Sequence, residues 1–175
     1  PGRAAVWVGH RCPAVLAARL HDGGDAARDL PPRGGEAELR RRGRDARLVI
    51  LGAAADRSAA LCRHATDAEA RALGVRGSLV MPGPVAGAAG LLSAFDVFLN
   101  TSLFEGVSVA TMEAVAAGVP VVAAEVGGQS EAISPTDVLL DGAAPDAVWA
   151  DAVEAAAARP RPPPLLDWRS RHGAA

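Results

Sequence analysis

The chain has 175 residues, half of them hydrophobic, and a formal net charge of −2 at pH 7. A chain of this length can bury one good core, which predicts a single α/β domain, and the slightly acidic balance offers no basic surface for nucleic acid. All 18 cationic residues are arginines, which excludes a P-loop lysine, a Schiff-base lysine and a Ser-x-x-Lys pair.

Strand-like and helix-like segments alternate along the chain. Strands are predicted near residues 5–8, 46–51, 78–81, 97–100, 119–123 and 138–140, and helices near 13–20, 36–42, 56–73, 85–95, 108–117 and 146–158. This alternation is typical of a Rossmann-like, doubly wound parallel sheet with helices on both faces. Right-handed crossovers would bring the carboxyl ends of the strands to one edge, where ligands bind in open α/β sheets.

Composition separates a tail from the folded part. Two Gly-Gly pairs and Pro31-Pro32 predict a surface loop over residues 22–35. The run Pro162-Pro163-Pro164 cannot continue a helix. We therefore expect a Rossmann-like domain over residues 1–159, with an atypical first 45 residues, and a proline-rich tail over 160–175.

The cysteines and the apolar runs bear on location and metal binding. Cys12 and Cys62 lie far apart in a chain without a signal-like start, which predicts reduced thiols in the cytoplasm. His10 and His64 beside them add too few ligands for zinc, so no metal site is expected. No apolar run approaches the ~20 residues that span a bilayer, so no integral membrane segment is expected.

The segment from Phe98 to Ala114 carries most of the functional information. An apolar strand leads into a polar turn and then a helix, with Glu105 and Glu113 at the two ends of the turn and first helical segment. The free N–H groups and the dipole at a helix N-terminus favour phosphate groups. Carboxylates accept hydrogen bonds from the hydroxyls of a sugar. The pattern suits a ligand that combines phosphate groups with a sugar.

The motifs around this segment, taken in order, resemble the signature of the group 1, or family 4, retaining glycosyltransferases, which have the two-domain GT-B fold. That family carries a Glu, seven intervening residues and a second Glu, here Glu105 and Glu113. A Gly-x-Pro-Val-Val strand and a Gly-Gly turn follow, here Gly118-Val119-Pro120-Val121-Val122 and Gly127-Gly128. The resemblance implies the C-terminal, donor-binding half of such an enzyme.

The resemblance also implies a role for each residue of the segment. Glu105, the catalytic-site residue, would contact the donor sugar. The backbone amides of Gly106, Val107 and Ser108 would cradle the diphosphate of the donor. Glu113 would bind the ribose hydroxyls of the nucleotide.

Without the resemblance, the same residues allow plainer interpretations. Glu105 could cap a helix N-terminus through the dipole. Glu113 could be an ordinary boundary residue of a helix whose core-facing stripe is Val109, Met112 and Ala116. The Gly-Gly turn could simply open a short helix with an acidic first turn.

Two regions further upstream match the family less closely. In the family, the main chain of a strand exit contacts the nucleotide base, which here implicates Val80, Met81 and Pro82, although a proline-stiffened strand exit explains these residues equally. Arg11 follows the first strand, where the family has an Arg and a Lys that clamp the diphosphate. The chain has no lysine, so Arg11 alone would supply a bidentate phosphate contact.

The resemblance implies metal-independent transfer of a sugar from a nucleotide-diphosphate sugar to an acceptor hydroxyl with net retention, and no cofactor besides that donor substrate. The expected partners are the nucleotide sugar and a separate N-terminal acceptor-binding domain or subunit, through which a cytoplasmic protein could attach to a membrane surface. Three alternatives stay open: a non-catalytic nucleotide-sugar-binding or interaction module, a truncated inactive remnant, and a nucleotide-sugar epimerase of the same architecture.

Overall fold

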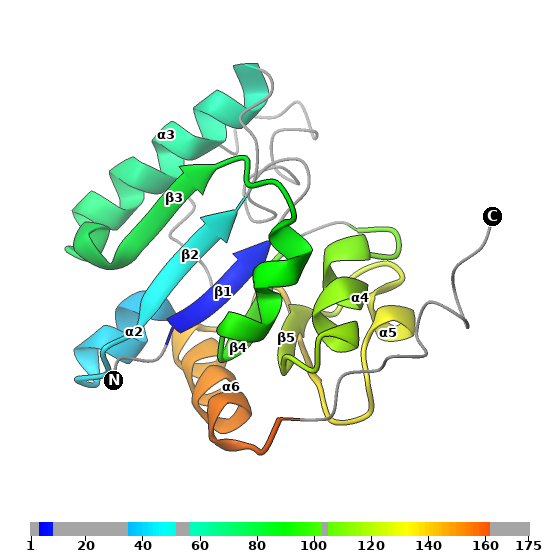
Figure 1. The fold of residues 1–175 in the computed structure, drawn as a ribbon. Helices are drawn as coiled ribbons and strands as arrows, with labels where there is room; N and C mark the ends of the chain where they lie inside the picture. Colours follow the sequence, from blue (N-terminus) through cyan, green and yellow to red (C-terminus); the bar gives the residue numbers. More distant parts are fainter. Residues whose placement is uncertain (1–3, 9–34, 52–56, 103–104, 162–175) are drawn as a thin grey trace.

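The computed structural model describes residues 4–8, 35–51, 57–102 and 105–161, and within them six strands form one parallel sheet (Figure 1). The strands are β1 (Ala4–Val8), β2 (Arg47–Leu51), β3 (Leu79–Gly83), β4 (Val97–Asn100), β5 (Val121–Ala124) and β6 (Val138–Leu140). Their order across the sheet is β3-β2-β1-β4-β5-β6. The predicted Rossmann-like, doubly wound parallel sheet is confirmed.

Helices connect these strands and cover the sheet (Figure 1). The α-helices are α2 (Glu36–Arg41), α3 (Arg57–Ala72), α4 (Val109–Ala116), α5 (Gln129–Ala132) and α6 (Asp146–Ala158), and the 3-10 helices are η2 (Arg76–Ser78) and η3 (Ala88–Ala94). The helix predicted for residues 13–20, the loop predicted for 22–35 except its last residue, and most of the proline-rich tail lie outside the described residues.

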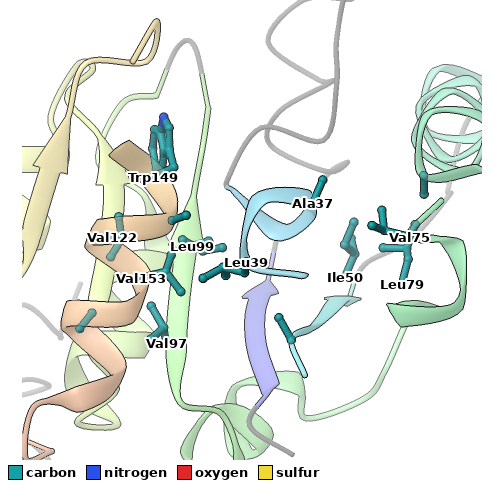
Figure 2. Close-up of a cluster of buried hydrophobic side chains, with 14 of the residues drawn as sticks. Ala37, Leu39, Ile50, Val75, Leu79, Val97, Leu99, Val122, Trp149 and Val153 are labelled. Atoms are coloured by element: carbon teal, nitrogen blue, oxygen red, sulfur yellow. The ribbon is translucent and has the colours of Figure 1, made fainter. Parts of the chain in front are cut away.

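The two faces of the sheet hold separate hydrophobic cores because neighbouring strand residues point to opposite sides. Val97 and Leu99 of β4 pack in the core under α2 and α6, whereas Phe98 between them packs in the core with α4 and η3. Figure 2 shows the first core, with Val97 and Leu99 facing Trp149 and Val153 of α6. All four residues of β4 are buried, as expected for a central strand covered on both faces.

The helix predicted for residues 85–95 is shorter and tighter than expected. Gly87 precedes it with a left-handed φ of 69°, and the helical residues Ala88–Ala94 adopt a 3-10 conformation. A residue with positive φ cannot continue an α-helix, so the helix begins only after it. The 3-10 helix still packs on α4 and places Leu92, which is fully buried, in the core.

Arginines following α2 connect that helix to α6. Arg42 donates from Nε to Glu38 Oε1 (2.8 Å) and from Nη1 to Asp151 Oδ1 (2.7 Å) and Glu154 Oε2 (3.1 Å). Arg44 donates to Glu154 as well. The hydrogen bond from Arg44 lowers the pKa of Glu154, with a further contribution from Arg42. These arginines therefore join the two helices at the surface.

Asp137 ties the start of β5 to the turn before β6. Its carboxylate accepts hydrogen bonds from Val121 N (2.9 Å), Ser134 N (2.8 Å) and Ser134 Oγ (2.8 Å). Asp137→Ala should lower the free energy of unfolding by about 2 kcal/mol, since hydrogen bonds to a charged group contribute about 1.5–3 kcal/mol. Urea denaturation measures the loss. Asp141→Ala is the control, because Asp141 accepts one exposed hydrogen bond from Ala143 N, and an equal loss in both variants would contradict the expectation.

The strand order marks where a ligand would bind. β1 has β2 on one side and β4 on the other, so the direction of winding reverses between β1 and β4. Ligands of open α/β sheets bind outside the carboxyl ends of the strands at such a switch point.

Over the described residues, no helix is both long and apolar enough to cross a membrane.

Candidate functional site

Polar residues stand at the carboxyl end of β4. Asn100, Thr101 and Ser102 are all buried, with 4% exposure or less. The Asn100 side chain accepts a hydrogen bond from Ser102 N (3.0 Å), and Ser102 Oγ donates to Glu105 Oε1 (2.7 Å). Glu105 is half-buried, and the hydrogen bond from Ser102 fixes one of its carboxylate oxygens close to the end of β4.

Helix α4 starts immediately after this turn. Ser108 is its N-cap, and Ser108 Oγ accepts from Thr111 N (3.3 Å). The N-cap is therefore Ser108 and not Glu105, whose carboxylate instead accepts a hydrogen bond from Ser102. The intrahelical ladder begins with Met112 N donating to the Ser108 carbonyl (3.1 Å), and the amides ahead of Thr111 belong to the free N–H groups of a helix start.

Gly106 and Val107, between Glu105 and the cap, are exposed, with Val107 exposed by 45%. The three residues predicted to supply phosphate-binding amides, Gly106, Val107 and Ser108, thus lie together at the N-terminus of α4. Such a position concentrates the positive end of the helix dipole and favours an anion.

Glu113 lies in the second half of α4 and is half-buried. The predicted core-facing stripe of Val109, Met112 and Ala116 is wrong. Val109 is 53% exposed, and the residues buried on this helix are Ala110, Thr111, Ala114 and Val115. Their four-residue spacing forms two adjacent rows, 110–114 and 111–115, that face the sheet. Glu113 stands at the border of this buried face.

The Gly127-Gly128 turn packs backbone to backbone against the Glu105-Gly106 turn. Gly128 N donates to the Gly106 carbonyl (2.9 Å), and Gly127 has a left-handed φ of 53°. A Cβ atom on Gly127 would lie 1.7 Å from the Glu105 carbonyl oxygen. The loops after the neighbouring strands β4 and β5 therefore meet, and the Gly-Gly pair is what allows them to come so close.

Helix α5 follows this turn with Gly128 as N-cap and Glu131 in its first turn. The plainer interpretation, a helix start with an acidic first turn, is thus correct as a description of the backbone. It leaves the contact with the Glu105-Gly106 turn unexplained, since a helix start requires no such approach.

Met81 and Pro82 belong to the edge strand β3, which β2 and β1 separate from β4. Pro82 and Val80 are exposed, and Met81 is half-buried against the core. Arg63 Nη2 donates to the Met81 carbonyl (2.6 Å). The structure therefore brings these residues to the same edge of the sheet as Glu105 but not beside it, and Arg11 lies outside the described residues.

Sequence reasoning missed the residues that hold Glu105 and the cap in place. Asn100 and Ser102 carry several of the hydrogen bonds of the site, and the available signal was the run of three polar residues that begins with the last residue of the apolar strand. Within the described part of the chain, four buried side-chain atoms have no hydrogen-bond partner: Thr101 Oγ1, Gln129 Nε2, Gln129 Oε1 and Trp149 Nε1. Across the described ranges, no group of three or more His, Cys, Asp or Glu residues could hold a metal ion.

Comparison with known proteins identifies the family. The model of the family described as glycosyl transferases group 1 matches residues 36–158. A D-inositol 3-phosphate glycosyltransferase of Corynebacterium diphtheriae is 37% identical over 115 residues, which cover 63% of this chain and 26% of that protein. The chain therefore spans about a quarter of the length of this curated relative.

Solved structures share the fold. Sucrose-phosphate synthase from Thermosynechococcus elongatus has a TM-score of 0.70 at 20% identity, covering 97% of this chain and 40% of that one. HepE of Anabaena in complex with UDP and glucose has a TM-score of 0.70 at 17% identity, with 97% and 44% covered. The C-terminal domain of a glycosyl transferase group 1 family protein from Francisella tularensis has a TM-score of 0.65 at 17% identity, with 98% and 87% covered.

The family match covers more than half of the chain and includes both glutamates, the α4 N-terminus and the Gly-Gly turn. The chain belongs to the group 1 glycosyltransferase family.

Proposed function

We propose that this chain is the donor-binding domain of a retaining glycosyltransferase that moves a sugar from a nucleotide-diphosphate sugar to an acceptor hydroxyl. The observation that carries the proposal is the contact of the loops after β4 and β5, at the edge of the sheet formed by the carboxyl ends of the strands. There the Gly127-Gly128 turn holds the backbone of Glu105 and Gly106 at the N-terminus of α4. A carboxylate and free amides thus occupy one place, as a ligand with a sugar and phosphates requires.

This arrangement supports the proposed roles of Glu105 and of the amides after it, and the family resemblance supports the others. Glu105 contacts the hydroxyls of the donor sugar, and the amides of Gly106, Val107 and Ser108 contact the diphosphate. The negative charge on the diphosphate grows as it leaves. N–H groups held in place at a helix start therefore stabilise the transition state more than the ground state. Glu113 binds the ribose hydroxyls, and Arg11, Met81 and Pro82 remain proposed contacts to the diphosphate and the base.

We infer that the acceptor is bound by a separate domain or subunit. The chain covers only 26% of the curated relative and 40% and 44% of the sucrose-phosphate synthase and HepE chains. Orienting an acceptor hydroxyl against the donor accounts for a large share of catalysis in such a transfer. The donor is proposed to bind without a metal ion or a further cofactor, in the cytoplasm.

The probes for the donor come from a relative. HepE of Anabaena was solved with UDP and glucose, so UDP-glucose and UDP are tested first, followed by the GDP-mannose and ADP-glucose pairs. Thermal unfolding measures binding, because a ligand specific for the folded state stabilises it by about 2.7 kcal/mol at a concentration of 100 Kd. For a domain of this size we expect a rise in Tm of about 5–10 °C for one base series. A panel without any rise, from a cooperatively unfolding chain, would contradict donor binding.

A second candidate is a non-catalytic nucleotide-sugar-binding module. It is favoured by the complete absence of lysine, since the family's diphosphate clamp includes one. The two candidates differ in turnover. The enzyme should transfer glucose from UDP-glucose to the acceptor hydroxyl and release UDP when its acceptor domain and an acceptor are supplied, whereas the module would bind the same donor and leave it intact under the same conditions.

A further inference from the structure

We propose that Ser102 is a positioning residue that sets the Glu105 carboxylate for the donor sugar, with Asn100 as its anchor; this inference rests on the proposed function. Neither residue belongs to the pair of glutamates or to the amides of the helix start. Both are nevertheless part of one chain of hydrogen bonds that ends on Glu105.

The end of this chain at Glu105 is a charge-assisted bond. Ser102 Oγ donates its single proton to Glu105 Oε1 at 2.7 Å. Ser102 is only 1% exposed, so water does not compete well for that proton, whereas Glu105 is half-buried and part of it reaches solvent. The serine thus restrains the carboxylate from the protein side, in a turn whose neighbour Gly106 is exposed.

The other end of the chain fixes Ser102 itself. Ser102 N donates to Asn100 Oδ1 (3.0 Å), and Asn100 Nδ2 donates to Ser108 Oγ (3.2 Å) and Thr111 Oγ1 (3.3 Å). The Asn100 side chain is 2% exposed, and its oxygen and its nitrogen both have partners. One buried amide therefore connects the strand end, the turn with Glu105 and the cap of α4.

This connection predicts a selective effect on ligands. If the Ser102 hydroxyl serves only the stability of the turn, its removal should weaken the binding of the nucleotide and of its sugar conjugate by the same factor. If the hydroxyl positions Glu105, its removal should weaken only the binding of the sugar conjugate, because the free nucleoside diphosphate has no group at that place. The ratio of the two dissociation constants separates the possibilities.

The test uses the 175-residue chain and isothermal titration with UDP and UDP-glucose, or with GDP and GDP-mannose if that pair gives the thermal shift. Ser102→Ala should weaken UDP-glucose binding by about tenfold and leave UDP binding within about twofold of the parent. Ser102→Cys keeps the volume but supplies a weak donor, so it should lose sugar affinity in the same direction. A Cys variant equal to the parent would mean that packing matters rather than the hydrogen bond.

Ser134→Ala is the matched control. Ser134 Oγ also donates to a carboxylate, that of Asp137, at 2.8 Å, but this pair joins the segment before β6 to the start of β5. Its loss should change Tm without changing the ratio of the two affinities. If Ser102→Ala weakens UDP and UDP-glucose alike, the positioning role is wrong and donor binding stands. If the parent binds no nucleotide and no nucleotide sugar, the proposed function is wrong and this role falls with it.

Discussion

Replacing Gly127 with alanine should lower the free energy of unfolding by about 3 kcal/mol and displace the Glu105 turn. Gly127 has a φ of 53°, and a left-handed conformation costs a non-glycine residue about 1–2 kcal/mol. Its added Cβ would also lie 1.7 Å from the Glu105 carbonyl oxygen, so backbone must move, which typically costs a further 1–3 kcal/mol or so. Thermal unfolding should show a Tm lower by about 6–12 °C.

Gly74→Ala separates the two costs. Gly74 has a φ of 71°, and nothing lies within 4 Å of the place its Cβ would take. This control carries the conformational cost without the collision, so it should lose only about 1–2 kcal/mol. Gly127→Ala should in addition weaken the binding of UDP-glucose, because Glu105 and the amides of α4 share the displaced backbone. Equal stability losses and unchanged binding in both variants would show that the two loops are not in close contact.

Much of the fold follows from local pattern. The strands at 97–100 and 138–140 and the helix at 146–158 have the predicted ends, because apolar runs and a long alanine-rich stretch leave little choice. The strand predicted at 119–123 begins two residues late, at Val121. Pro120 has no N–H to donate to the sheet, and Val119 N donates instead to the Ala114 carbonyl of α4. Buried apolar residues alone therefore do not define a strand.

The site was predictable only where its residues are contiguous. Glu105, the exposed residues after it and the start of α4 follow one another in the chain. The contact between Gly127 and Glu105 depends on β4 and β5 lying side by side, which sequence order alone does not fix. Asn100 and Ser102 act through hydrogen bonds that form only once the turn has its shape. The stripe on α4 was misread because Val109 projects from the first turn, where no core faces it.

Replacing Glu113 with glutamine should weaken UDP binding about 30-fold, a loss of about 2 kcal/mol, if Glu113 binds the ribose. A carboxylate accepts hydrogen bonds from both ribose hydroxyls, and the amide offers one acceptor oxygen and no charge. The ribose is common to UDP and UDP-glucose, so both should lose affinity by the same factor. Ser102→Ala, in contrast, should affect only the sugar conjugate, and isothermal titration distinguishes these two patterns.

Glu69→Gln is the control for the change of charge. Glu69 is also a half-buried glutamate within a helix, but it lies on α3 at the other end of the sheet. Glu69→Gln should leave the affinities for UDP and UDP-glucose unchanged. Any effect common to Glu69→Gln and Glu113→Gln would therefore reflect net charge rather than contact with the ligand. UDP affinity within about twofold of the parent in Glu113→Gln would remove the ribose assignment. Glu105 would then be the glutamate of the pair that remains tied to the donor, through its sugar.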